Sequence, residues 1–297
     1  MPEHFDLPAQ DTDRVFRIGL LTDIHFGNDS LRARQELAFC RMDSLGLRLL
    51  CLMGDIVDNA LSDNYETARR LVNKLNTPML ALTGNHEVFP LSLPVEACLA
   101  NFRTGMGRPR HYAWRYFDPY LFVFLGIDQR EPHLPKTRRD TGTSEQQLQW
   151  LRATLQAHAQ TPTVIVSHAP LENTVEDSDH FPLAASSQLY DILGEAPQVF
   201  LWLSGHTHLP DVHCGESLKT AVALGSGCTF VHVPPVADYY VHVIKGDRQF
   251  FRGGEDLQTR LLTCHPDRIE VQTYDILANA LQPMVTVRPT IRRASAA

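Results

Sequence analysis

The sequence has no uninterrupted apolar run of the length that a membrane-spanning helix requires. Its first stretch, Met1 to Arg17, is polar and lacks the basic and apolar segments of a secretory signal. Lysine and arginine number 27 against 34 aspartates and glutamates, so we expect no broad basic face of the kind that coats nucleic acid. These absences predict a cytoplasmic protein with no membrane segment, and they argue against nucleic acid as a partner.

Closely spaced cysteine pairs are also absent. The six cysteines are far apart and include no C-x-x-C pair: Cys40, Cys51, Cys98, Cys214, Cys228 and Cys264. This spacing argues against a disulfide framework or a zinc knuckle, and it predicts separate, mostly buried thiols in a reducing compartment. No internal repeat or low-complexity tract is present.

What the chain does contain is apolar material for one large core, at 43% of 297 residues. Its first third alternates short apolar runs with segments of helical periodicity. The strand candidates are Val15–Thr22, Leu49–Met53 and Pro78–Leu82, and the helix candidates between them are Ser30–Leu45 and Ser62–Leu75. Such alternation predicts βαβ units and a parallel sheet that is covered on both faces.

The middle of the chain is less regular. Proline and glycine punctuate Val88–Arg110, so we expect a long surface excursion there, and Glu131–Gly142 reads as a second basic loop. Asp118-Pro119 separates two strands of a hairpin. The remaining candidates are hairpin strands Tyr112–Phe117 and Tyr120–Ile127, a helix that starts at Ser144, strands Thr163–Val166 and Val199–Leu203, and a helix at Ser187–Leu193.

Short strand-like segments dominate the rest: Ala221–Leu224, Tyr239–Ile244, Ile269–Tyr274 and Val285–Val287. We expect the tail after Gly227 either to complete the second sheet or to form an edge that pairs two subunits, which leaves a homodimer open.

Polar residues follow the ends of five predicted strands. The set is Asp23, His25, Asp55, Asn85, His86, His168, His206 and His208. In open α/β sheets, sites form in the crevice outside the carboxyl ends of the strands, so five strand ends deliver these side chains to one place.

The chemistry of this set points to metals. Apart from His86 it holds two carboxylates, one amide and four imidazoles, a mixture that suits Zn, Mn, Fe or Co better than Ca or Mg. These ligands are too many for one tetrahedral ion and about enough for two. Two metals roughly 3.5–4 Å apart activate a water and stabilise both oxygens of a phosphoryl transfer. The natural bridging ligand is a carboxylate.

The runs TDIH, MGDIVD, GNHE, SHAP and SGHTH resemble the five-part motif of the calcineurin-like metallophosphoesterases, over roughly Val15 to His208. HYAWRYFDPYLFVFLGIDQ followed by SEQQLQWLRATL is similar to the bacterial branch that includes the class III cyclic nucleotide phosphodiesterases. The resemblance implies a four-layer αββα sandwich of two mixed β-sheets flanked by helices, with a dinuclear metal site at the C-terminal ends of the strands. It implies a metallophosphoesterase domain at 15–250, a flexible segment at 1–14, and a strand-rich extension of the same domain at 251–297.

The resemblance also implies roles for individual residues. Asp23, His25 and His208 correspond to ligands of one divalent metal, and Asn85, His168 and His206 to ligands of the other, with Asp55 bridging. His86 corresponds to the residue that lies beside the phosphoryl group and assists the leaving oxygen, with Asn85 also facing the substrate. Asp58 corresponds to the carboxylate that orients His86. Metals of this family type are Mn, Fe or Zn, and the implied reaction is hydrolysis of a phosphomonoester or phosphodiester by a hydroxide that both metals bind.

Two departures narrow the branch. Asn59-Ala60 replaces the Arg-Gly of protein Ser/Thr phosphatases, and Asp58 stands where purple acid phosphatases carry a ligating Tyr. For the substrate we expect a small phosphoester such as a nucleotide. Solvated surface charge is the commoner explanation of the two basic loops, and the alternative is that Arg108 or Arg110 contacts the substrate. The alternatives are a DNA nuclease on the same fold, which the acidic net charge of −7 disfavours, and a non-catalytic scaffold, which the complete ligand set disfavours.

Overall fold

The structure is a computed structural model that describes residues 15–131, 133, 141–213, 216–225, 227–243, 247–251 and 256–290. The expected flexible segment 1–14 and the basic stretch Lys136–Arg139 lie outside the described residues. In the part that is described, every helix is too short or too polar to cross a bilayer.

The first sheet has six strands in the order β16-β15-β14-β1-β2-β3. Three of them are parallel, so their carboxyl ends meet at one edge, where Leu21 pairs with Leu52 and Leu52 with Ala81. The strands are β1 (Phe16–Leu21), β2 (Leu49–Leu52), β3 (Met79–Ala81), β14 (Gln258–His265), β15 (Arg268–Asp275) and β16 (Ala280–Val287).

The second sheet also has six strands, in the order β10-β11-β7-β6-β5-β4. Its inner strands β5, β6, β7 and β11 are parallel, and β4 and β10 pair antiparallel at the two edges. The strands are β4 (Ala113–Phe117), β5 (Tyr120–Leu125), β6 (Thr163–Ser167), β7 (Val199–Ser204), β10 (Ala221–Ala223) and β11 (Thr229–His232). Two small hairpins complete the described strands: β8 (Val212–His213) with β9 (Glu216–Ser217), and β12 (Tyr239–Val243) with β13 (Asp247–Phe251).

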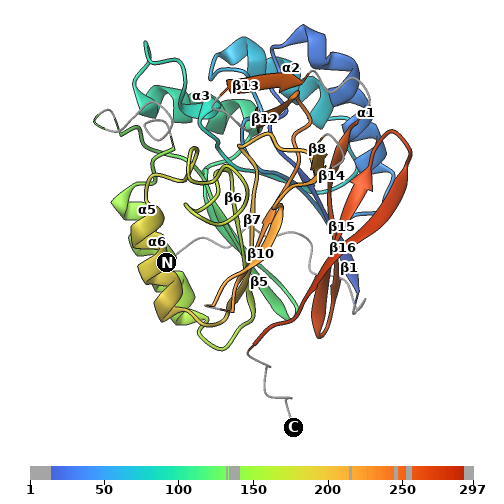
Figure 1. Cartoon of the computed structure of the whole chain (residues 1–297). Helices are drawn as coiled ribbons and strands as arrows, with labels where there is room; N and C mark the ends of the chain where they lie inside the picture. The colour runs from blue at the N-terminus through green and yellow to red at the C-terminus, as the bar shows by residue number, and fades with distance from the viewer. Residues whose placement is uncertain are drawn as a thin grey trace.

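Helices cover the outer face of each sheet, and the two sheets face each other (Figure 1). Strand residues alternate between the layers: Leu49 and Cys51 of β2 lie in the core between the sheets, whereas Leu50 and Leu52 pack under the first helical layer. The helices are α1 (Arg32–Asp43), α2 (Ser62–Val72) and α3 (Val95–Met106) over the first sheet, and α5 (Glu145–Ala157) and α6 (Ser186–Glu195) over the second. The expected αββα sandwich is therefore confirmed.

The strand and helix positions predicted up to Leu82 are confirmed to within a few residues, and so is the hairpin of β4 and β5. Ser144 caps α5 as predicted, because its hydroxyl accepts a hydrogen bond from the Gln147 N–H at 3.3 Å. The surface excursion expected at Val88–Arg110 is wrong in its centre, because α3 lies there. Pro94 caps this helix and Gly107, in the left-handed region at φ 62°, ends it, so the same residues that suggested a loop mark the helix boundaries.

The strands after Gly227 contribute to both large sheets. Among them, β11 joins the second sheet as expected, between β7 and β10, but β14, β15 and β16 extend the first sheet, with β14 antiparallel to β1. The strand β14 was not predicted, since Arg260 and Thr259 interrupt its apolar pattern. Of the described cysteines, Cys51, Cys98, Cys228 and Cys264 are buried free thiols as predicted, and Cys40 is exposed.

Phe102 on α3 tests the corrected assignment, because its side chain is fully buried between α2 and the first sheet. We expect Phe102→Ala to lower the free energy of unfolding by about 3–5 kcal/mol in urea denaturation. The exposed neighbour Thr104→Ala should change it by about 0.5 kcal/mol or less. A Phe102→Ala loss as small as the control's would contradict the packing of α3.

Candidate metal centre

The predicted donors all follow strand ends at the same edge of the sandwich. Loops after β1, β2 and β3 carry Asp23, His25, Asp55, Asn85 and His86, and loops after β6 and β7 carry His168, His206 and His208. The two sets come from different sheets, and backbone hydrogen bonds join the loops within each set, such as Asp23 N–H to the Gly54 carbonyl (3.1 Å) and Gly205 N–H to that of His168 (2.7 Å). The structure thus brings all eight side chains to one place.

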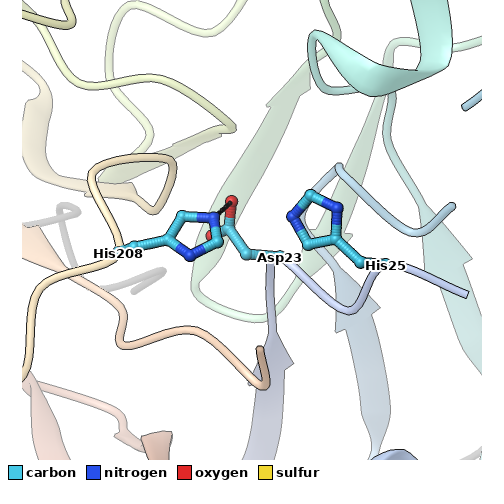
Figure 2. Close-up of side chains that lie close together, drawn as sticks. All are labelled: Asp23, His25 and His208. Atoms are coloured by element: carbon cyan, nitrogen blue, oxygen red, sulfur yellow. Dashed lines mark ion pairs between the residues drawn. The ribbon is translucent and has the colours of Figure 1, made fainter. Parts of the chain in front are cut away.

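The donor atoms form three overlapping groups, within each of which the atoms lie no more than 4.8 Å apart. The groups are Asp23 with His25 and His208, His25 with Asp55 and His86, and Asp55 with His168 and His206. Figure 2 shows the first, in which His208 and His25 approach Asp23 from opposite sides and His208 Nε2 lies 3.1 Å from Asp23 Oδ1. Asp55 and His25 each belong to two of these groups and so connect all three.

Asn85 joins the cluster through its side-chain oxygen, which lies 3.1 Å from His168 Nε2. His168 Nε2 in turn lies 3.3 Å from Asp55 Oδ2 and 3.8 Å from Asp23 Oδ1. Amide oxygen, imidazole nitrogen and carboxylate oxygen therefore meet around one point.

The donor set fits metal ions. Nε2 of His25 and Nε2 of His206 are buried and have no hydrogen-bond partner in the described part of the chain. A buried nitrogen without a partner costs about 1–3 kcal/mol, so such atoms persist where something else binds them. Nε2 of His25 lies 3.9 Å from Asp55 Oδ2, and His206 shares a donor group with Asp55, so a divalent cation in the cluster satisfies both nitrogen and carboxylate donors.

Backbone carbonyls fix the orientation of three imidazoles. Nδ1 of His208 donates to the Asp238 carbonyl (2.7 Å), Nδ1 of His168 to that of Met53 (3.0 Å), and Nδ1 of His86 to that of Asp58 (2.6 Å). Each contact directs Nδ1 to a carbonyl, so Nε2 of His168 and Nε2 of His208 are the ring nitrogens that face the cluster, as in metal-ligating histidines.

The charge states of Asp55 and His206 suit ligation as well, whereas His168 must release a proton to bind a metal. Burial lowers the pKa of His168, but Asp55 and Asp23 outweigh burial and raise this pKa to about 9. Burial alone raises the pKa of the Asp55 carboxyl, but the neighbouring His168 and His86 outweigh it and hold the pKa well below its usual range. Burial, together with the charge of His168, lowers the pKa of His206 to about 3. An ionised carboxylate and a neutral imidazole are the forms that bind metals.

Backbone strain is concentrated in the same residues. Five of them have a positive φ, which non-glycine residues rarely adopt: Asp23 (52°), His25 (55°), Asp55 (47°), His206 (70°) and His208 (54°). Each such residue costs on the order of 1–3 kcal/mol and is kept only where the surroundings impose it. The concentration of strained residues in the strand-end loops therefore indicates that these loops form a functional site.

Three glycines allow the loops to approach one another. A Cβ on Gly54 would lie 2.8 Å from His168 Nδ1, one on Gly84 would lie 2.5 Å from the Asp55 backbone nitrogen, and one on Gly205 would lie 2.8 Å from Asp23 Oδ2. Real Cβ atoms do not come so close, so each ligand loop requires glycine beside it.

Glu87 is a site residue to which sequence reasoning gave no role. Its buried carboxylate accepts four backbone N–H groups: those of Asp55 (2.8 Å), Ile56 (2.8 Å), Val57 (3.0 Å) and Gly84 (2.6 Å). It therefore ties the loop after β2 to the loop after β3. Glu87 is the last residue of the GNHE motif, so the sequence did mark its position. Only the fold shows which backbone amides its carboxylate accepts.

A second unforeseen group lies behind His206 and His208. The ring of His232 lies 3.3 Å from the hydroxyl of Thr207 between them, and the His232 carbonyl accepts from Nε of Arg260 (3.0 Å). Arg260 is fully buried and pairs with Asp211 through both terminal nitrogens, one of them at 2.6 Å. These residues of β11 and β14 show that the tail supports the metal-ligand loop.

The predicted partner of His86 is only partly as expected. Asp58 contacts His86 through its carbonyl, whereas its carboxylate faces His25, with 3.5 Å between Oδ1 and Nδ1. The carboxylate was expected to orient His86, but the peptide oxygen is what occupies that position.

Arg108 and Arg110 do not lie at the cluster. They line a separate small pocket between the edge strands β3 and β4, where Arg108 donates to the Met79 carbonyl at the start of β3. The donors instead line a pocket of about 380 Å³, with Leu31, Phe181 and Asp238 at its walls. A substrate contact for either arginine is therefore not supported.

Gly84 tests the close approach of the loops. We expect Gly84→Ala to displace Asp55 and to weaken binding of Mn²⁺ by about tenfold or more, the size of effect seen when support of a ligand is lost. The measurement is metal content by mass spectrometry after equilibrium dialysis. Gly194→Ala in α6, where an added Cβ meets no atom within 4 Å, is the control. Equal metal binding by both variants would contradict the steric argument.

Comparisons with known proteins agree with this geometry. The sequence profile described as calcineurin-like phosphoesterase matches residues 16–210. A probable cyclic nucleotide phosphodiesterase of Synechococcus sp. is 27% identical over 213 residues, which cover 68% of this chain and 77% of that protein. A 3′,5′-cyclic-nucleotide phosphodiesterase of Nostoc sp. is 27% identical over 166 residues, covering 54% of this chain and 56% of that relative.

Two solved structures share the fold. A dimetal phosphatase from Danio rerio superposes with a TM-score of 0.64 at 17% identity, covering 94% of this chain and 100% of its own. A purple acid phosphatase from yellow lupin (Lupinus luteus) seeds gives 0.63 at 13% identity, covering 94% of this chain and 54% of its own. Since the family profile spans residues 16–210 of 297 and the donors cluster within it, the chain belongs to the calcineurin-like phosphoesterase family and is a metal-dependent phosphoesterase.

Proposed function

We propose that this protein hydrolyses small phosphodiesters, cyclic nucleotides among them, at a centre of two divalent metals (Mn, Fe or Zn). The observation that carries the proposal is the cluster of donors from five strand ends, with Asp55 shared between two groups. The relatives from Synechococcus and Nostoc, both described as cyclic nucleotide phosphodiesterases, support the choice of substrate class.

In this proposal, Asp23, His25 and His208 hold one metal and Asn85, His168 and His206 hold the other, with Asp55 between them. When bound, two such metals supply an activated water and neutralise charge on the phosphoryl oxygens. The protein's own part is to keep the donors in place, which the carbonyls behind His168 and His208 and the carboxylate of Glu87 do.

His86 is the proposed acid for the leaving oxygen. Its Nδ1 is occupied by the Asp58 carbonyl, so its Nε2 is the atom available to a substrate in the pocket that it lines. Burial opposes protonation, but Asp55 and the Asp58 carbonyl outweigh it and raise the pKa of His86. A protonated Nε2 donates its proton as the ester bond breaks.

Carboxylates in the pocket wall favour diesters over monoesters, in opposition to the attraction that the metals exert on both. The carboxylates of Asp58, Asp177 and Asp238 line the pocket in addition to the proposed ligands. A phosphodiester carries one negative charge at neutral pH, whereas a monoester carries about two and meets more repulsion from these carboxylates.

Two substitutions distinguish the proposed metal ligand Asp55 from the proposed acid His86. We expect Asp55→Ala to lose both metal and activity, because it removes the shared ligand. His86→Ala should keep its metal and lose about 10²–10⁴-fold in kcat, the range for a general acid. The measurements are metal content and hydrolysis of bis(p-nitrophenyl) phosphate with added Mn²⁺. Full activity of the metal-free protein, or metal loss in His86→Ala, would refute the assignment.

A substrate comparison tests the diester preference. We expect kcat/KM for bis(p-nitrophenyl) phosphate to exceed that for p-nitrophenyl phosphate by about tenfold or more, which corresponds to about 1.4 kcal/mol of added repulsion. Asp238→Asn should narrow this ratio, because it removes one carboxylate from the wall. Cleavage of plasmid DNA in preference to either small ester would instead favour the nuclease alternative.

A further inference from the structure

Three large apolar side chains are exposed on the two loops that carry Asp58 and His86. They are Leu61 (46% exposed), Phe89 (38%) and Leu91 (49%), and we refer to them as the apolar rim. An apolar side chain in water is common singly, but a group of them beside a polar pocket marks a binding surface.

The two loops of the apolar rim are joined to each other. The Ala60 N–H donates to the Phe89 carbonyl (2.6 Å), and the Asn101 amide of α3 donates to the Ala60 carbonyl (2.9 Å). These bonds place Leu61 and Phe89 side by side along the chain segments next to His86.

Arg130 holds the second loop from behind. Its guanidinium donates to the carbonyls of Leu93 and Pro90, both at 2.9 Å, and to that of Val88. Several hydrogen bonds thus hold the backbone around Phe89 and Leu91, so these exposed side chains lie on an ordered loop. A surface that is ordered before binding loses little entropy when a ligand docks on it.

The apolar rim begins where the metal pocket ends. The Phe89 ring centroid lies 6.2 Å from that of His86, and His86 lines the pocket. Since His86 is the proposed acid for the leaving oxygen, whatever is attached to that oxygen lies on the same side. In a 3′,5′-cyclic nucleotide the leaving oxygen belongs to the sugar that carries the base.

We propose that the apolar rim is a subsite for the aromatic base of the substrate, with Phe89 as its stacking surface. The inference rests on the proposed function and names the part of the substrate that gives it selectivity. A nucleobase offers a flat face that stacks on a phenyl ring. Leu61 and Leu91 add exposed apolar surface on the same two loops.

The test compares two esters that differ only in the base: adenosine 3′,5′-cyclic phosphate and methyl riboside 3′,5′-cyclic phosphate. Both are followed by ³¹P NMR with Mn²⁺ present. We expect the wild type to prefer the nucleotide in kcat/KM, and Phe89→Ala to lower that preference by about tenfold, since stacking of one base contributes about 1–3 kcal/mol. Leu61→Ala should lower it less, because an aliphatic side chain does not stack.

Leu277→Ala is the matched control, since Leu277 is 43% exposed in the turn between β15 and β16 and Leu61 is 46% exposed. It should keep the wild-type preference. A wild type without preference, or a Phe89→Ala variant that retains it, would overturn the subsite while the phosphodiesterase activity stands. A change in the molar mass of Phe89→Ala in light scattering, with the preference retained, would identify the rim as a protein contact and also overturn it. If the wild type hydrolyses neither ester nor bis(p-nitrophenyl) phosphate, the proposed function itself fails.

Discussion

The whole site depends on one constraint, which is that loops from two sheets must come close enough for their side chains to share ions. One such close approach is that of Gly54, Gly84 and His168, where a Cβ added to Gly54 would lie 2.7 Å from the Gly84 nitrogen and 2.8 Å from His168 Nδ1. Glu87 makes the same approach favourable, because its carboxylate accepts amides from both loops of the first sheet. Without the glycines the donors cannot converge, and without Glu87 their amides lack a common acceptor.

This arrangement explains why the ligand residues have strained backbones. A left-handed φ at Asp23, Asp55 and His206 turns the backbone sharply shortly after each strand ends. Such conformations persist because other bonds impose them, for example the Ile24 N–H to the Asp55 carbonyl (2.7 Å). The strain and the hydrogen bonds together hold the donors before any metal binds, which lowers the reorganisation that binding requires.

The support extends beyond the part of the chain that the family profile matches. Residues 16–210 contain every donor, yet β14 pairs with β1, and Arg260 of β14 contacts the His232 carbonyl behind the His206–His208 loop. A fully buried guanidinium needs a paired carboxylate, and Asp211 supplies it from the segment that follows that loop. The tail is therefore part of the structural unit that supports the site.

The sequence by itself determined the alternation of strands and helices up to Leu82 and the donor set, because hydrophobic periodicity and side-chain chemistry are local properties. It also pointed to the edge of the sheet, since strand ends can be found by the same pattern. Only the tertiary structure decided the positions of α3 and β14. Proline and glycine occur both in loops and at helix ends, so the sequence alone did not show that Pro94 and Gly107 mark the ends of a helix. Arg260 fits a buried strand only because Asp211 pairs with it. Only the tertiary structure shows that Arg108 lies away from the metal pocket, that the Glu87 carboxylate accepts backbone amides, and that the Asp58 carboxylate faces His25. Each of these depends on a contact between residues that are distant along the chain or on the three-dimensional course of a loop, and no local pattern records such contacts.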